Sequence, residues 1–173
     1  MRAGGPVEAD AMRQAKPADT SAPPGGTLVL MFLLAGKQFA LDLGRVEQII
    51  DYQTPTRTPR RPPFVEGVIE HRGRFLALAS LRRRLGVADA TPTHHPAILL
   101  LRGIGQDPLV GLVVDQVVRV MTLPPDGVLA PPPRVFGIRA EYIRGVANAG
   151  GKPVVWLDET KLLTSSEPIT LLA

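Results

Sequence analysis

One glycine-bounded pattern occurs twice in this chain and constrains its fold more than any other feature. The first copy covers residues 67–73 and the second covers residues 145–151, and both begin and end with glycine. The 78-residue offset between them also aligns Ser80 with Asp158, so each copy is followed by a residue type that caps helices. Coincidence does not readily place glycines, caps and apolar faces in one register. The sequence therefore predicts a duplicated structural unit.

The first copy has the pattern of a β-hairpin. Two short apolar runs flank a charged turn that is closed by Gly73, which can adopt a positive φ where the chain reverses. With glycine at that position, the turn is expected to need no strained residue. Arg72 is expected at the tip of the turn, where its long side chain can reach a partner.

The predicted fold class is all-β. The chain contains 18 prolines and 17 glycines, as expected for many short strands joined by turns, and its apolar content is mainly Val, Leu and Ala. Each half is predicted to form a small barrel of about five strands, with a short helix after its hairpin. Two such barrels should pack together, because about 60–70 residues bury little apolar surface alone.

The predicted domain organisation has four parts. Residues 1–26 contain few large apolar residues and are expected to be a disordered tail. The ordered domain is expected over residues 27–165, with one lobe over about 27–88 and a second over about 96–165. Residues 166–173 are assigned to a C-terminal tail. No apolar run reaches the roughly 18–20 residues that cross a bilayer, and the N-terminus lacks a signal peptide's apolar centre, so the protein is expected to be soluble and unsecreted.

The sequence offers little support for catalysis. The absence of cysteine excludes disulfides, thiolate metal sites and thiol nucleophiles. His94 and His95 are adjacent, and sequence neighbours rarely chelate one metal, while His71 is better suited to a surface role than to general-base chemistry. Asp115 and Asp158 are interpreted as turn and capping residues. We therefore predict no enzymatic activity, no cofactor and no metal site.

Four segments together resemble the CheW domain family. They are Leu28–Ile49, Pro63–Gly73, Gly111–Val117 and the closing Val154–Asp158 with its short helix. Each motif alone is weak, but together they cover nearly all of the expected ordered chain.

The resemblance implies two SH3-like five-stranded β-barrels packed around a shared apolar interface. It also implies a non-enzymatic adaptor that couples the cytoplasmic tip of a methyl-accepting chemoreceptor to the regulatory domain of a histidine kinase. Such an adaptor is cytoplasmic and is recruited to membrane-associated receptor arrays. The family's receptor-contact positions fall here on Val46, Gly67 and Arg72.

Two departures from the family pattern affect polar residues near that site. The turn Asn-Leu-Arg-Gly is replaced by Glu70-His71-Arg72-Gly73, and the glutamate of Val-X-Glu-Ile is replaced by Gln48. A specialised chemosensory or pilus-motility system is therefore as compatible with the sequence as a standard chemotaxis array.

Simpler interpretations are also open. Val46 can be an ordinary core residue, and Gly67 can simply allow close packing. The alternative function is a basic β-barrel that binds nucleic acid through the arginines of residues 57–84. Few aromatic residues accompany those arginines, whereas base stacking normally needs them, so no nucleic-acid partner is expected.

Overall fold

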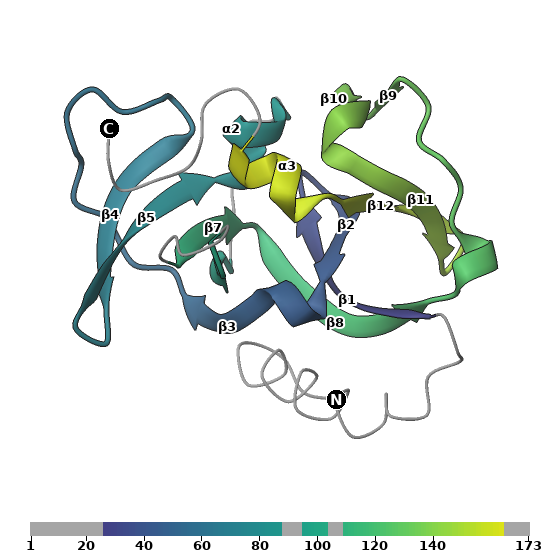
Figure 1. The fold of residues 1–173 in the computed structure, drawn as a ribbon, viewed down its shortest axis with the longest axis horizontal. Helices are drawn as coiled ribbons and strands as arrows, with labels where there is room; N and C mark the ends of the chain where they lie inside the picture. Colours follow the sequence, from purple (N-terminus) through teal and green to yellow (C-terminus); the bar gives the residue numbers. More distant parts are fainter. Residues whose placement is uncertain (1–25, 88–94, 104–108, 165–173) are drawn as a thin grey trace.

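The computed structural model describes residues 26–87, 95–103 and 109–164. Of the predicted tails, residues 1–25 of the N-terminal tail (1–26) and all of the C-terminal tail (166–173) lie outside the described residues, as does His94. Within them, the chain forms two five-stranded sheets, one two-stranded ribbon and two short helices (Figure 1). The predicted all-β class with helices after the hairpins is confirmed.

The first five-stranded sheet, sheet A, contains strands from both ends of the chain. Its spatial order is β11 (Ile143–Ala149), β12 (Lys152–Leu157), β2 (Lys37–Asp42), β1 (Thr27–Leu34) and β8 (Gln116–Leu123). All of its neighbouring strands are antiparallel except β12 and β2, which are parallel.

The second five-stranded sheet, sheet B, is built from the middle of the chain. Its order is β3 (Val46–Asp51), β6 (Ala97–Leu101), β7 (Val110–Val114), β5 (Arg74–Ser80) and β4 (Val65–His71). Here β5 and β7 form the parallel pair. Sheet A read from β8 to β11 and sheet B read from β3 to β4 have the same succession of antiparallel and parallel pairs. This is the duplication that the sequence predicts.

The predicted lobe ranges do not match these sheets. Sheet A takes β1 and β2 from the range 27–88, and sheet B takes β6 and β7 from the range 96–165. The chain crosses between sheets twice, once through the 3-10 turn Leu43–Arg45 and once at Asp115, which alone separates β7 from β8. Because of these crossings, each expected lobe gives two strands to the sheet that is formed mainly by the other lobe. Each of these pairs of strands, β1–β2 and β6–β7, is apolar and finds its remaining partner strands far away in the sequence.

In each sheet, the loop that follows one edge strand pairs with the opposite edge strand. Thr56, after β3, exchanges backbone hydrogen bonds of 2.9 and 2.8 Å with Val68 on β4. Leu129, after β8, makes the equivalent pair with Val146 on β11, with both distances 2.9 Å. These bridges link the edge strands of each sheet, as a small SH3-like barrel requires.

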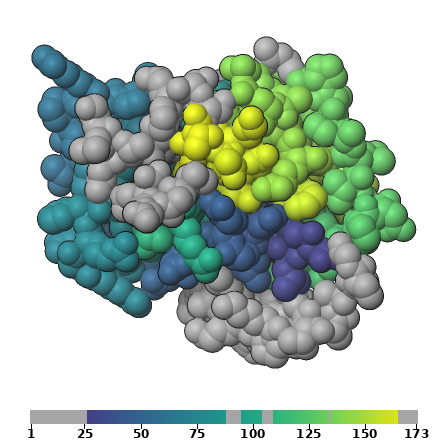
Figure 2. Space-filling view, viewed as in Figure 1, coloured from purple at the N-terminus to yellow at the C-terminus, as the bar shows by residue number. Residues whose placement is uncertain are grey.

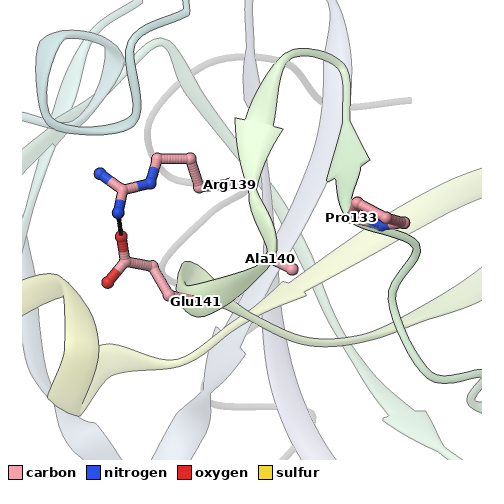
Figure 3. A pocket seen from close by; sticks show the side chains of 4 residues that line it. All are labelled: Pro133, Arg139, Ala140 and Glu141. Carbon is pink, nitrogen blue, oxygen red and sulfur yellow. Dashed lines mark ion pairs between the residues drawn. The ribbon is translucent and has the colours of Figure 1, made fainter.

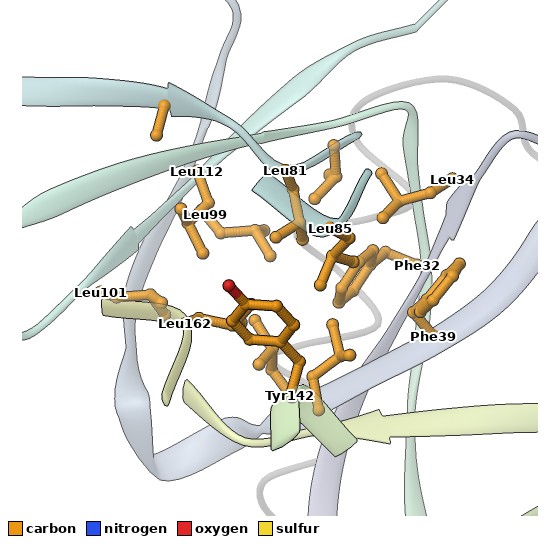
Figure 4. Packing of buried hydrophobic residues seen from close by; sticks show 14 of the residues in the cluster. Phe32, Leu34, Phe39, Leu81, Leu85, Leu99, Leu101, Leu112, Tyr142 and Leu162 are labelled. Carbon is orange, nitrogen blue, oxygen red and sulfur yellow. The ribbon is translucent and has the colours of Figure 1, made fainter. Parts of the chain in front are cut away.

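The two sheets pack against each other through an extensive apolar cluster. Sheet A contributes residues such as Phe32 and Phe39, and sheet B contributes Leu99, Leu101 and Leu112 (Figure 4). Two smaller clusters lie on the opposite faces, one around Met31 and Val154 in sheet A and one around Leu76 and Ile98 in sheet B. The sheets thus share one core and each retains a smaller core of its own.

Helices α2 (Leu81–Leu85) and α3 (Glu159–Thr164) lie where the two sheets meet (Figure 1). The predicted cap is confirmed, since Ser80 Oγ accepts a hydrogen bond of 3.3 Å from the Arg83 amide. Arg84 is only 6% exposed; its guanidinium stacks on Phe64 at 4.3 Å and donates a hydrogen bond of 2.8 Å to the Leu162 carbonyl. This arginine ties the first helix to its repeat counterpart.

The predicted hairpin over residues 67–73 is confirmed, with one correction at its turn. Arg72 has φ 53° and Gly73 has φ 76°, so both central residues are left-handed. This is the turn that best matches the twist of paired strands, and it imposes strain on the non-glycine residue. The expectation that no residue of the turn is strained was therefore wrong.

Candidate functional site

Val46 is a core residue in this structure. It begins β3, is 5% exposed and belongs to the cluster between the two sheets. Its side chain therefore does not reach the surface, and any effect of this position on a partner has to act through the packing of β3.

Gly67 lies beneath the chain's own loop. Its φ is 151°, and a Cβ at this position would collide with the carbonyl oxygen of Thr56. Gly145 holds the same place in the second hairpin, where a Cβ would meet Val128 and Leu129. The close packing allowed by both glycines brings each loop onto its edge strand, which explains why the repeat preserves them.

Arg72 is the predicted site residue that is exposed. It lies at the tip of the β4–β5 hairpin, next to the exposed residues Glu70 and Arg74. No ion pair joins Arg72 to another residue within the described ranges. Its guanidinium is therefore presented to solvent by two paired strands and is suited to a carboxylate or a group of carbonyl oxygens.

Gln48 connects the Val46 region to the Arg72 region. Its Oε1 lies 3.2 Å from the Nε2 of His71, within hydrogen-bonding distance, although β3 and β4 are the two outer strands of sheet B. Both residues are departures from the family pattern, and in the structure they touch each other. The altered polar residues thus form one contact that fixes the hairpin beside β3.

Phe75 belongs to this region and was missed by the sequence analysis. It lies on β5, directly opposite Glu70, and is 63% exposed. The alternation of side chains along β5 could have identified it. Leu76 and Leu78 point into the core of sheet B, so Phe75 has to point away from that core. A continuous apolar run concealed this alternation.

A buried ionic cluster lies at the start of α3. Glu159 is 1% exposed, and its Oε1 accepts a hydrogen bond of 2.9 Å from Arg144. Its Oε2 is buried and has no hydrogen-bond partner among the described residues. Burial raises the pKa of the Glu159 carboxyl, nearby Asp42 raises it further, and Arg144 only partly offsets both effects. Asp158 beside it caps the helix through a bond of 3.1 Å from the Lys161 amide, as predicted.

The surface hollow in Figure 3 does not resemble a catalytic site. It is lined by Pro133, Arg139, Ala140 and Glu141, and Arg139 and Glu141 form an ion pair with each other. In the part of the chain that the structure describes, no group of acidic and histidine side chains is arranged to hold a metal ion. The described residues therefore offer interaction surfaces and no convergent set of reactive groups.

The arginines considered for nucleic-acid binding are partly used inside the protein. Arg61 donates to the carbonyls of Val65 and Thr58, Arg82 binds Asp115, and Arg84 is buried. These arginines therefore do not form one free basic face. In addition, no helix within the described ranges is long and apolar enough to cross a membrane.

Comparisons with known proteins agree on one family. Residues 28–167 match the model of the CheW-like domain. Chemotaxis protein CheW of Treponema pallidum is 28% identical over 142 residues, which cover 80% of this chain and 83% of that protein. Protein FrzA of Myxococcus xanthus is 33% identical over 113 residues, which cover 64% of this chain and 69% of FrzA.

A solved structure supports the fold independently. The crystal structure of scaffolding protein TtCheW from Thermoanaerobacter tengcongensis superimposes with a TM-score of 0.74 and covers 84% of this chain and 93% of its own. The sequence identity is 24%, so this likeness concerns the fold alone.

Proposed function

This chain belongs to the CheW-like domain family, and from that premise we propose that it is a non-enzymatic adaptor of a bacterial chemosensory array. It binds the cytoplasmic tip of a methyl-accepting chemoreceptor and the regulatory domain of a histidine kinase. It is cytoplasmic and reaches the membrane through the receptors. Chemotaxis protein CheW among its relatives supports the signalling context of this proposal.

The observation that carries the proposal is the presentation of Arg72. Two packed sheets with a shared core hold the β4–β5 hairpin, and the Gln48–His71 contact fixes it beside β3. Arg72 projects from the tip without an ion pair to any described residue. The hairpin backbone that carries the guanidinium is fixed, so little loop freedom remains to be lost when Arg72 binds a protein surface.

The three positions implied by the resemblance then act differently. Arg72 contacts the receptor directly. Val46 keeps β3 in the shared core, and Gly67 lets the Thr56 loop close over β4, so both shape the surface without touching the receptor. Substitutions at Val46 or Gly67 weaken binding only to the extent that they disturb this region.

We propose further that the adaptor serves a specialised array. Gln48 stands where the family pattern has glutamate and His71 where it has leucine, and these two residues are in contact, so the partner's matching surface is expected to differ as well. One relative, protein FrzA of Myxococcus xanthus, is not named as a chemotaxis protein, which is consistent with such diversity.

Binding of purified fragments tests the proposal. Wild-type protein should bind a receptor cytoplasmic fragment and the kinase regulatory domain from its own host. Arg72→Ala should weaken receptor binding by about 1–3 kcal/mol, the range for losing a charge-assisted interfacial hydrogen bond. Arg72→Lys should rescue it only partly, because an ammonium cannot make a planar two-point contact.

Arg119→Ala is the matched control, because Arg119 is exposed on β8 in the other sheet. Both alanine variants should unfold within about 0.5 kcal/mol of wild type. The adaptor assignment fails if wild type binds neither fragment but recovers RNA or DNA from its host. Arg72 is instead a structural residue if Arg72→Ala lowers the melting temperature sharply and leaves the affinity intact.

A further inference from the structure

We propose that Phe75 is the apolar anchor of the receptor-contact surface, with Arg72 at the tip of the same hairpin. This inference rests on the proposed adaptor function and extends it to the chemistry of the partner. The complementary receptor surface is an apolar pocket bordered by Asp or Glu side chains.

Strand pairing fixes the direction in which Phe75 points. Residues directly opposite each other in an antiparallel pair share one face of the sheet. Ile69 and Leu76 form one such pair and are buried in the inner cluster of sheet B. Glu70 and Phe75 form the next pair along the strands, so Phe75 lies on the other face of sheet B. This face, here called the outer face, is the one that packs against sheet A farther along β5.

That outer face carries an apolar stripe from the core to the surface. Ala79 and Ala77 on β5 belong to the cluster that packs against sheet A. Val68, which pairs with Ala77, is half-buried, and Phe75 is 63% exposed. The stripe thus continues past the place where sheet A stops covering sheet B, and it ends on an aromatic ring.

The hairpin that carries this ring projects from the body of the molecule. In Figure 1 the tip between β4 and β5 extends beyond the other strands, and in Figure 2 the same part of the sequence forms the lower left corner of the face shown. A large apolar side chain at such a corner is accessible to a partner. Phe75 lies within a strand, with its backbone held by the pairing of β4 and β5, so its direction is fixed before binding.

The charge around Phe75 defines the rest of the partner surface. Arg72 is exposed at the tip and forms no ion pair with another described residue. Arg74 is exposed too, but it precedes Phe75 on β5 and points to the opposite face. Glu70 is the acidic neighbour opposite Phe75. Aromatic and arginine side chains are prominent among the few residues that dominate the binding energy of protein interfaces, and Arg72 at the tip favours a carboxylate beside an apolar pocket. Arg72 is the proposed receptor contact and lies on the same hairpin, so the occupant is the receptor.

Substitution of Phe75 separates this inference from the proposed function. With the full-length protein and a receptor cytoplasmic fragment, Phe75→Ala should weaken binding by at least about 10-fold, as expected for an anchor residue. Phe75→Leu should retain most of the affinity, because it keeps an apolar side chain. Leu129→Ala is the matched control: Leu129 is 71% exposed but lies after β8, and its loss should leave receptor affinity unchanged.

Salt dependence distinguishes the anchor from its charged neighbours. Receptor binding of Arg72→Ala should depend less on ionic strength than binding of wild type, whereas Phe75→Ala should keep the wild-type dependence. Urea unfolding of Phe75→Ala should match wild type, since the ring is already mostly exposed.

Two results would overturn the inference. In the first, Phe75→Ala binds the receptor fragment as tightly as wild type does, which leaves the adaptor function intact and removes the anchor. In the second, Phe75→Ala loses affinity for the kinase regulatory domain and keeps it for the receptor, which assigns this surface to the other partner. If wild type binds neither fragment, the proposed function itself fails.

Discussion

At Gly67 the backbone of a neighbouring loop occupies the space where any other residue would place its Cβ. Gly67→Ala should destabilise the protein by about 2–4 kcal/mol, because it combines an unfavourable φ of 151° with a collision against Thr56. Urea unfolding measures this change. Gly36→Ala is the control: Gly36 also has a positive φ, of 76°, but no atom lies within 4 Å of its Cβ position, so it should cost only about 1 kcal/mol.

Equal losses in the two variants would show that backbone strain alone matters and that the Thr56 contact does not. The glycine pattern in the sequence indicated that something approaches Gly67 closely. It could not identify the approaching group, because a missing side chain carries no information about its neighbour.

Glu159 makes stability depend on pH in a defined direction. Burial raises the pKa of its carboxyl above the ordinary value of 4.5, so the charged form is disfavoured in the folded state. This cost is present in full above the folded-state pKa and is relieved as the pH falls toward 4.5. Glu159→Gln lacks this titration.

Relative to Glu159→Gln, wild type should therefore gain free energy of unfolding as the pH falls from neutral toward about 4.5. Urea unfolding of both proteins at several pH values measures the difference. A difference that is constant with pH, or that changes in the opposite direction, would show that the Glu159 pKa is not raised on folding.

Among the connecting elements, the crossing at Asp115 holds three parts of the structure together. Its carboxylate accepts hydrogen bonds from the Ala35 amide at 2.7 Å, in the β1–β2 turn, and from Arg82 Nε at 2.8 Å, in α2. Asp115→Asn should destabilise the protein by about 1.5–3 kcal/mol, because these bonds involve a charged and largely buried acceptor.

Glu47→Gln provides the comparison for Asp115. Glu47 pairs with Arg102 at 2.7 Å, but the two side chains are 44% and 63% exposed, so its loss should cost less than about 1 kcal/mol. Thermal or urea unfolding of both variants checks the order. Equal effects would mean that Asp115 does not join the elements around it.

The elements that the sequence predicted well are those specified locally. The Arg72–Gly73 hairpin and the Ser80 cap depend on residues within a few positions, and both are confirmed. The assignment of β1 to a sheet is not local: Phe32 and Leu30 pair with β8 because packing between sheets selects that partner. An apolar strand of eight residues fits many edges equally well, so its pairing could not be predicted from its own sequence.

On the scale of the whole molecule, the strands of sheet A occur along the chain in a circularly permuted order relative to those of sheet B. Sheet B is formed by residues 46–114, whereas sheet A needs residues 116–157 together with β1 and β2. A permutant opened between Leu43 and Gly44, with the native ends joined, should make each sheet contiguous in sequence. It should unfold cooperatively, and its free energy of unfolding should fall only by what the intact 3-10 turn contributes.

A chain that lacks residues 27–42 should instead show no cooperative unfolding, because β8 and β12 lose the strands between them. Circular dichroism during urea titration distinguishes the two outcomes. If the permutant fails to fold while the deleted chain folds, sheet A does not depend on the N-terminal hairpin.

The exchange of strands has a consequence for the protein as it is made on the ribosome. The β1–β2 hairpin emerges before the other described strands, yet its partners β8 and β12 comprise residues 116–123 and 152–157. Until those strands are made, both edges of this apolar hairpin therefore lack their final partners, which is the state most prone to intermolecular pairing. Sheet B can assemble earlier, while the β1–β2 hairpin has to wait for β12, the last strand of its own sheet.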